Sequence, residues 1–202
     1  PEVYGDTENW IQENHNFNPT TPYSISRAAC DMHLLSFHKA YDFPVVFTRA
    51  ANVFGPGQQL YRIIPRTILS ARSGKKLQLH GGGYSKRSFI HISDVVNLTL
   101  ELALNAEPGT CWHISTKEAF NIREIVEKIC RITEINFDSI VEEVGERLGK
   151  DKNYLLDSCK ARNSFKWVEK INLEDGINNT IEWIDDNYLE LSNLKWTYTH
   201  KE

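Results

Sequence analysis

Residues 21–52 read TPYSISRAACDMHLLSFHKAYDFPVVFTRAAN and decide the fold class of this chain. Thr21 can cap a helix that begins at Pro22 and runs to about Tyr41, since proline suits the first helical position. The run 44–48, PVVFT, then predicts a short buried strand that ends in a loop. One face of this helix is marked by apolar positions that recur at helical spacing, namely Ile25, Ala28, Ala29, Met32 and Leu35. A helix followed by a buried strand and a loop is typical of parallel α/β sheets, in which such loops hold ligands.

Strands and helices continue to alternate after this stretch. Residues 6–20 carry no sustained period and are predicted to be a loop. Short apolar runs predict strands at 77–79, 88–92 and 111–114. Capping residues and apolar periodicity predict helices near 60–72, from a cap at Ser93 to about Asn105, from a capping box at Asn121, and from Asn172 onward. The chain is therefore predicted to be an α/β protein.

Composition narrows the class of protein further. The chain has 202 residues, of which 41% are hydrophobic and 25% charged, with a net charge of −4. These values are typical of a folded domain and give no basic surface for nucleic acid. No apolar run is long enough to span a membrane, so we expect a soluble, cytoplasmic protein without a membrane partner. The cysteines, Cys30, Cys111, Cys130 and Cys159, lack metal-site spacing and are expected to be reduced, mostly buried thiols, with no bound metal.

Tyr23 and Arg27 lie four residues apart on the first predicted helix, so their side chains share a face. A positive charge beside a phenol favours phenolate, which is the form that can accept a proton. Such a pair also occurs by chance on many surfaces, and its meaning depends on the neighbouring sequence.

Four segments together resemble a known family. Residues 22–29, PYSISRAA, resemble the Pro-Tyr-Ser-x-Ser-Lys-Ala segment of the extended short-chain dehydrogenase/reductases. Residues 2–5, EVYG, 87–94, RSFIHISD, and 147–151, RLGKD, are similar to segments of the nucleotide-sugar dehydratases and epimerases in that superfamily. The last of these segments, with Tyr154, Asp157, Lys160 and Trp167 after it, most resembles the C-terminal portion of dTDP-glucose 4,6-dehydratases.

The resemblance implies a hydride shuttle with NAD as cofactor. The sugar is oxidised at C4, a proton leaves C5, water leaves from C6, and the hydride returns to C6. Tyr23 would take the C4 hydroxyl proton, and Arg27, at the position of the family's lysine, would also contact the nicotinamide ribose. Glu2 would remove the C5 proton.

The resemblance also implies a nucleotide-diphosphate sugar as the substrate. Arg87 and Arg147 would bind the diphosphate, because planar guanidinium groups match it with paired hydrogen bonds. Asn52 would contact the phosphate or the sugar from its strand-end loop. Three further positions are expected near the same ligand: Arg62, His113 and Lys150.

Two departures from the family pattern leave the reaction open. The dehydratases have an aspartic acid before the glutamate, where this chain has Pro1, which has no proton to donate. Arg27 is bulkier than the family's lysine and has a different donor geometry. The alternatives are a UDP-sugar 4-epimerase or decarboxylase, which need no such acid, and a catalytically silent relative that still binds nucleotide sugars.

No glycine-rich fingerprint for a dinucleotide follows any predicted strand. We therefore expect residues 1–57 to be the C-terminal part of a doubly wound, Rossmann-like NAD-binding domain whose N-terminal half is missing, and this fragment alone to be inactive. Residues 58–202 are expected to form mainly a small mixed α/β lobe that binds the nucleotide sugar, with strands of 88–114 partly returning to the core sheet. By resemblance, the Tyr23 helix would join a homodimer interface.

Overall fold

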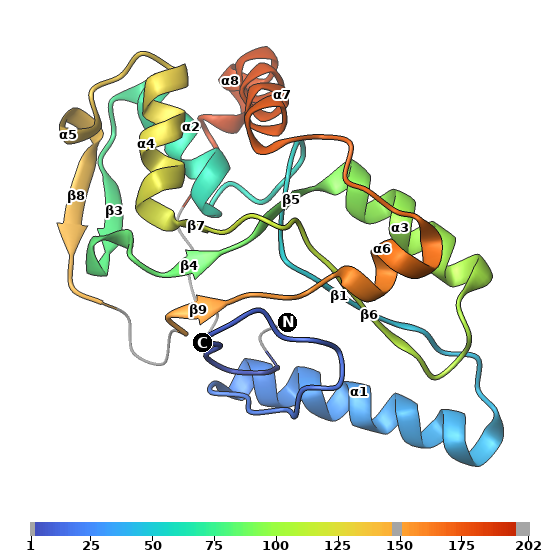
Figure 1. Ribbon diagram of the computed structural model, residues 1–202. Helices are drawn as coiled ribbons and strands as arrows, with labels where there is room; N and C mark the ends of the chain where they lie inside the picture. The colour runs from blue at the N-terminus through green and yellow to red at the C-terminus, as the bar shows by residue number, and fades with distance from the viewer. Residues whose placement is uncertain (1–2, 147–150, 197–202) are drawn as a thin grey trace. The chain divides into compact units, whose positions relative to one another are not determined.

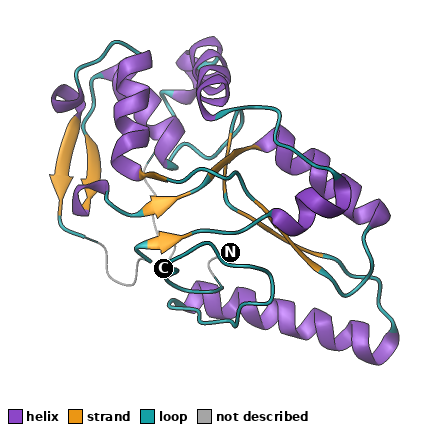
Figure 2. Ribbon diagram, in the orientation of Figure 1, coloured by secondary structure: helices purple, strands orange, loops and turns teal. Residues whose placement is uncertain are grey.

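The computed structural model describes residues 3–146 and 151–196, which form two compact units. Unit 1 contains the described residues within 1–53, 85–119 and 148–170, and unit 2 contains those within 54–84, 120–147 and 171–202. Figure 1 labels the helices and strands, and Figure 2 shows that the strands are short beside the main helices. Each unit is described by itself below.

Unit 1 contains parallel strand pairs and three helices. β1 (Phe47–Ala50) pairs in parallel with β6 (Cys111–Ile114), and β4 (Lys86–Arg87) pairs in parallel with β9 (Asn153–Tyr154). β2 (Asn52–Phe54) pairs with β5 (Phe89–His91). The helices are α1 (Pro22–Tyr41), α3 (Ile92–Asn105) and α6 (Cys159–Phe165). Parallel pairing of strands separated by helices confirms the α/β prediction.

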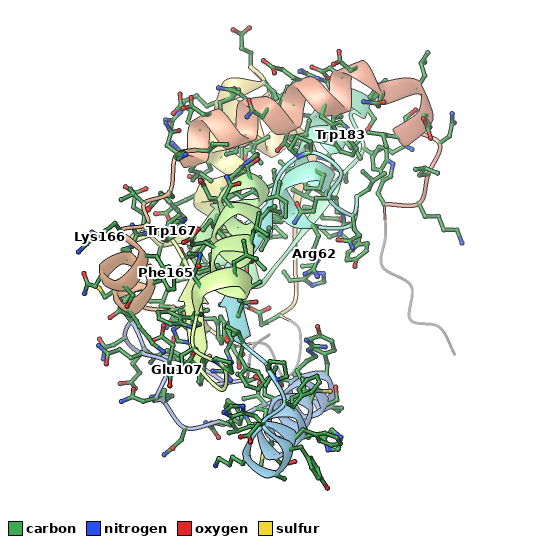
Figure 3. All side chains as sticks on the ribbon, turned by 90° about the vertical axis from the view of Figure 1, so that its right-hand side faces the viewer. Arg62, Glu107, Phe165, Lys166, Trp167 and Trp183 are labelled. Carbon is green, nitrogen blue, oxygen red and sulfur yellow. The ribbon has the colours of Figure 1, made fainter. Side chains whose placement is uncertain are left out.

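The main core of unit 1 lies where α3 and α6 pack against β6. Its buried members include Leu98, Leu102, Trp112, Ile114 and Ala161. Phe165 and Trp167, labelled in Figure 3, are half-buried against this cluster. Edge-to-face packing of the Phe165 ring on Trp112, with centroids 5.1 Å apart, fixes the end of α6 on the strand.

Unit 2 is built from helices beside a second parallel pair, β3 (Leu77–His80) with β8 (Val141–Val144). Its other elements are α2 (Ile63–Ser73), η1 (Gly81–Gly83), β7 (Phe120–Asn121), α4 (Ile122–Ile132), α5 (Phe137–Ile140), α7 (Leu173–Asp186) and α8 (Tyr188–Leu191). Apolar side chains of α2, β3, α4 and α5 form its core. An ion pair between Arg72 and Asp185, 2.7 Å apart, joins α2 to α7.

The bounds predicted for α1 are confirmed, and the apolar face marked by the sequence is only partly buried. Thr21 caps the helix and Pro22 begins it, as the sequence indicates. Ile25 and Met32 are 54% and 62% exposed, whereas the buried side is centred on Ser24 and Ala28. On this side Ala28 packs in an apolar cluster that includes Val3 and Leu156, and Asp31 pairs with Arg49.

Two other boundaries also differ from the sequence prediction. The first strand begins at Phe47, three residues after the predicted start, because Pro44 has no N–H to donate and Val45 turns back to bond the Phe43 carbonyl. The N-cap of α3 is His91 rather than Ser93, since the His91 Nδ1 atom accepts the Ser93 N–H at 3.3 Å.

All four cysteines are free, but the prediction that they are mostly buried is wrong. Cys130 is buried, Cys111 is half-buried, and Cys30 and Cys159 are exposed. Cys30 lies on α1 and Cys159 on α6, where the nearby buried residues are Ala28 and Ala161. Among residues 3–146 and 151–196, no helix is both long and apolar enough to cross a membrane.

Candidate active site

The start of α1 holds Tyr23 and Arg27 on one face. The Thr21 hydroxyl accepts the Ser24 N–H, and the Ser24 hydroxyl accepts the Thr21 N–H, which closes a capping box around the first turn. The Tyr23 side chain is 66% exposed, and Arg27 is exposed one turn later. Neither the phenol nor the guanidinium has a hydrogen-bond or ion-pair partner among the residues that the structure describes. Both are therefore open to a ligand.

Arg87 is almost fully buried, at 5% exposure, and binds main-chain carbonyl groups. Its Nη1 atom donates to the carbonyls of Lys86 and Lys152, at 2.8 and 3.2 Å, and its Nη2 atom donates to that of Asp151 at 2.8 Å. The guanidinium is thus held rigidly at the point where β4 meets β9.

Three segments that are distant in the sequence meet beside Arg87. The Val3 carbonyl accepts the Asn18 N–H at 2.9 Å, so the segment after Glu2 lies against the approach to α1. The Asn153 N–H donates to Asp6 Oδ1 at 2.7 Å, and the Thr7 N–H donates to the Asn153 carbonyl at 3.0 Å. Segments 3–7, 18–21 and 151–155, which we call the junction, therefore form one hydrogen-bonded body within unit 1.

The other predicted site residues lie in different surroundings. Asn52 is half-buried at the start of β2, and its N–H donates to the Ser88 carbonyl at 3.0 Å. Arg62, labelled in Figure 3, precedes α2 in unit 2 and is exposed, with its guanidinium 5.4 Å from the centroid of the Tyr61 ring. Glu2, Arg147 and Lys150 lie outside the described residues.

His113 is fully buried in β6, and both of its ring nitrogens have partners within the protein. Nδ1 lies 3.1 Å from the Asp157 carbonyl, which can only accept, so Nδ1 carries the proton. Nε2 then accepts the Tyr4 hydroxyl at 2.8 Å. A ligand contact through this ring would require one of these bonds to be released, and the contact stays a prediction.

A buried polar cluster around Arg49 was missed by the sequence analysis. Arg49 is paired with Asp31 of α1, 2.7 Å from Nη2 and 3.2 Å from Nε, and its Nη1 donates to the Tyr4 hydroxyl and to Cys111 Sγ. With His113 these residues form a chain of hydrogen bonds between α1 and the strands. In the sequence, Arg49 follows the predicted strand 44–48, and this position alone does not indicate that Arg49 pairs with Asp31.

Burial controls the electrostatics of this cluster. Burial, and secondarily the Arg49 charge, lower the pKa of His113 to about 4, so that its ring is neutral at pH 7. Burial also raises the pKa of the Tyr4 hydroxyl and brings that of the Cys111 thiol to about 11. All three groups are thus held in their neutral forms beside one buried cation. The cluster is suited to fixing geometry rather than to transferring protons.

Two cavities lie in unit 1 away from the predicted catalytic pair. One of about 550 Å³ is lined by residues that include Glu13, Asp157 and Lys160. The other, of about 300 Å³, is lined by residues that include Asp31 and Arg49. Neither is lined by Tyr23, Asn52 or Arg87. Within residues 3–146 and 151–196, no cluster of side chains could hold a metal ion.

Comparison with known proteins places the chain in a family. Residues 1–180 match the family described as GDP-mannose 4,6 dehydratase. A trifunctional UDP-glucose 4,6-dehydratase/3,5-epimerase/reductase of Arabidopsis thaliana is 34% identical over 190 residues, which cover 92% of this chain and 28% of that protein. The chain belongs to the GDP-mannose 4,6 dehydratase family.

Solved structures agree with this assignment and with the predicted fold. The crystal structure of dTDP-glucose 4,6-dehydratase from Bacillus anthracis in complex with NAD aligns with a TM-score of 0.89 and 30% identity. That alignment covers 94% of this chain and 60% of the other. A UDP-glucuronic acid 4-epimerase from Bacillus cereus aligns with a TM-score of 0.86 and 25% identity, over 93% of this chain and 60% of the other. The fold is therefore Rossmann-like, as predicted, and the chain spans 60% of the length of the dehydratase structure.

Proposed function

We propose that the whole protein is an NAD-dependent nucleotide-sugar 4,6-dehydratase of the dTDP-glucose type. This chain spans 60% of the length of the bacterial dehydratase that it resembles, so the proposal concerns the activity of the complete enzyme. The family assignment supports the class of substrate and the reaction. The placement of named side chains supports the roles given below.

The observation that carries the proposal is the exposed pair Tyr23 and Arg27. They lie one turn apart on a capped helix, free of partners among the described residues, in the same unit as Arg87 and Asn52. A buried tyrosine could not reach a ligand in this way. Tyr4, for example, is 1% exposed and its hydroxyl is already bonded on both sides.

The residues present fit one end of the cofactor. The Tyr23 hydroxyl and the Arg27 guanidinium would hold the nicotinamide ribose, since both are exposed donors on one helix face. When bound, NAD supplies the hydride acceptor and later the hydride donor. No glycine fingerprint that would cradle the pyrophosphate occurs in the 202 residues.

The chain's own residues would move two protons. Tyr23 takes the proton of the C4 hydroxyl, since oxidation of that carbon requires the proton to leave. The positive charge of Arg27 stabilises the phenolate that accepts it. Glu2, outside the described residues, would then remove the C5 proton, which the neighbouring ketone has made acidic, and water would leave from C6.

Substrate binding would depend on Arg87, which lies beside the junction. Arg87 is held by three carbonyl groups, so its guanidinium would bind the diphosphate with little loss of side-chain entropy. Asn52 would contact the phosphate or sugar from the start of β2. The other residues proposed for this ligand are Arg62, His113, Arg147 and Lys150.

The activity is tested by incubating the complete enzyme and NAD with dTDP-glucose and UDP-glucose, followed by mass spectrometry. A product lighter by one water supports the proposal, and unchanged sugar refutes it. Tyr23→Phe should lower turnover by about 10²–10⁴-fold, the range for loss of a general acid–base group. Tyr84→Phe is the control, because that phenol is 69% exposed and is outside the residues proposed for the site.

A second candidate function is a 4-epimerase or decarboxylase acting on UDP-sugars. Pro1 favours it, because this side chain cannot supply the acid that a dehydratase uses on the leaving hydroxyl. The same incubation with UDP-glucose and UDP-glucuronic acid separates the candidates. An epimer has unchanged mass and is distinguished from unreacted substrate by proton NMR, whereas a decarboxylated product is lighter by carbon dioxide.

We propose a second copy of the same protein as the partner of α1. Cys30, Leu34, Phe37 and Tyr41 are exposed and follow spacings of four, three and four, as in the seam between two packed helices. An uncharged stripe of this kind is self-complementary across a two-fold axis. Phe37→Glu should convert the enzyme to a monomer in analytical ultracentrifugation, and a monomeric wild type would refute the proposal.

A further inference from the structure

Asp151 is a buried carboxylate in the junction that contacts the approach to α1. The residue is 5% exposed. Its Oδ1 atom accepts the Thr20 hydroxyl at 2.8 Å, across 131 positions in the sequence. Thr20 directly precedes Thr21, the cap of the helix on which Tyr23 is the second residue. The carboxylate therefore fixes the backbone at the point where the catalytic helix begins.

The main chain of the same residue contacts the proposed diphosphate arginine. The Asp151 carbonyl accepts Arg87 Nη2 at 2.8 Å, and the pairing of Arg87 with Tyr154 in β4 and β9 holds both strands in register. Asp151 thus binds the helix start through its side chain and Arg87 through its carbonyl. Within unit 1, this path joins the two site residues through one amino acid.

We propose that Asp151 is a positioning residue that sets the distance between the proton acceptor Tyr23 and the diphosphate-binding Arg87. Tyr23 has an exposed side chain without a hydrogen-bond partner among the described residues, so its position depends on the backbone of the first helical turn. Arg87 is fixed by carbonyl groups. A substrate held at its diphosphate reaches Tyr23 in the reactive geometry only if the two anchors keep their spacing. This inference rests on the proposed function.

The packing and hydrogen-bonding roles of Thr20 can be separated by substitution. A Cβ atom at Gly5 would lie 3.3 Å from the Thr20 methyl carbon, so the methyl group fills space against the segment 3–5. Thr20→Val keeps this methyl group and replaces the hydroxyl that donates to Asp151 by a second methyl group. Thr20→Ser does the reverse, which makes the two variants a matched pair.

The test is a single turnover of the complete enzyme with dTDP-glucose, followed by absorbance of the reduced nicotinamide. We expect Thr20→Val to slow this step by at least about tenfold, since small misplacements of reacting groups have large effects on rate. Thr20→Ser should stay within about threefold of the wild type, which corresponds to less than 1 kcal/mol at 1.4 kcal/mol per tenfold change. The Kd for dTDP should be unchanged in both, because Arg87 keeps its carbonyl partners.

Three results would overturn the inference. Wild-type kinetics in Thr20→Val would show that the hydroxyl is not needed, and equal losses in both variants would assign the effect to packing. A rise in the dTDP Kd that matches the loss of rate would assign the effect to binding. If Thr20→Val does not fold, Thr20→Ala against Thr20→Ser repeats the comparison, since these differ only by the hydroxyl.

The wild-type reaction separates this inference from the proposed function. A wild-type enzyme without turnover on any nucleotide hexose would refute the proposed function, and the positioning role would fall with it. Turnover by the wild type together with unchanged kinetics in Thr20→Val would refute the positioning role alone.

Discussion

Lowering the pH from 7 to 5 should destabilise the protein through one buried histidine. The His113 ring is fully buried, donates from Nδ1 to the Asp157 carbonyl and accepts the Tyr4 hydroxyl at Nε2. A second proton would face the Tyr4 donor and would lie near the Arg49 cation, in a ring that is buried from solvent. Burial and this charge lower its pKa from the ordinary 6.5 to about 4.

The sign and size of the effect follow from proton linkage. Between pH 4 and 6.5 the unfolded chain binds more protons at His113 than the folded chain, so the free energy of unfolding rises with pH. With these two pKa values, the contribution at pH 5 is about 2 kcal/mol lower than at pH 7. It is fully lost only below about pH 4.

Urea unfolding of the wild type and of His113→Gln at both pH values measures this contribution. The drop in unfolding free energy between pH 7 and pH 5 should be about 2 kcal/mol smaller in the variant, because glutamine does not titrate. His33→Gln, which removes an exposed ring on α1, is the control and should keep the wild-type drop. An equal drop in wild type and His113→Gln would refute the assignment of a neutral, buried ring.

Two further substitutions test the packing that supports the site. Gly5 has φ +70° and a Cβ atom there would overlap the Asn18 carbonyl oxygen, so Gly5→Ala should lower the unfolding free energy by more than about 2 kcal/mol. Gly57→Ala, at φ +80° with open space around it, should cost only about 1 kcal/mol in the same urea titration, and equal losses would contradict the overlap. Asp31→Asn should cost about 3 kcal/mol by leaving the Arg49 cation poorly compensated. Asp31→Leu combined with Arg49→Met should recover most of that loss, and a double variant no more stable than Asp31→Asn would show that the charge pair itself stabilises the fold.

Local chemistry made the helix ends predictable from the sequence. Thr21 with Ser24, and Asn121 with Glu124, satisfy the free N–H groups of a first turn through residues only three positions apart. No long-range information is needed for such a cap. His91 escaped prediction because imidazole is an uncommon cap, and the neighbouring Ser93 offered a more usual one.

The buried face of α1 could not be predicted, because its partner is not local. Periodicity assigns the apolar positions to the interior, yet Ile25 and Met32 are exposed while Asp31 is directed inward. The charge of Asp31 is acceptable there only because Arg49 lies opposite, 18 positions later in the chain. A single sequence contains no signal that these two residues meet.

The same argument explains which part of the site the sequence revealed. Tyr23 and Arg27 share one helix, so their spacing alone places them on a common face. Arg87 and Asp151 are 64 positions apart, and a motif can mark each of them as important without giving the contact between them. That contact depends on the parallel pairing of β4 with β9, which brings residue 87 opposite residue 154. Side chains that act on the substrate can thus be found by local pattern, whereas the residues that hold them in place become visible only when the strand register is known.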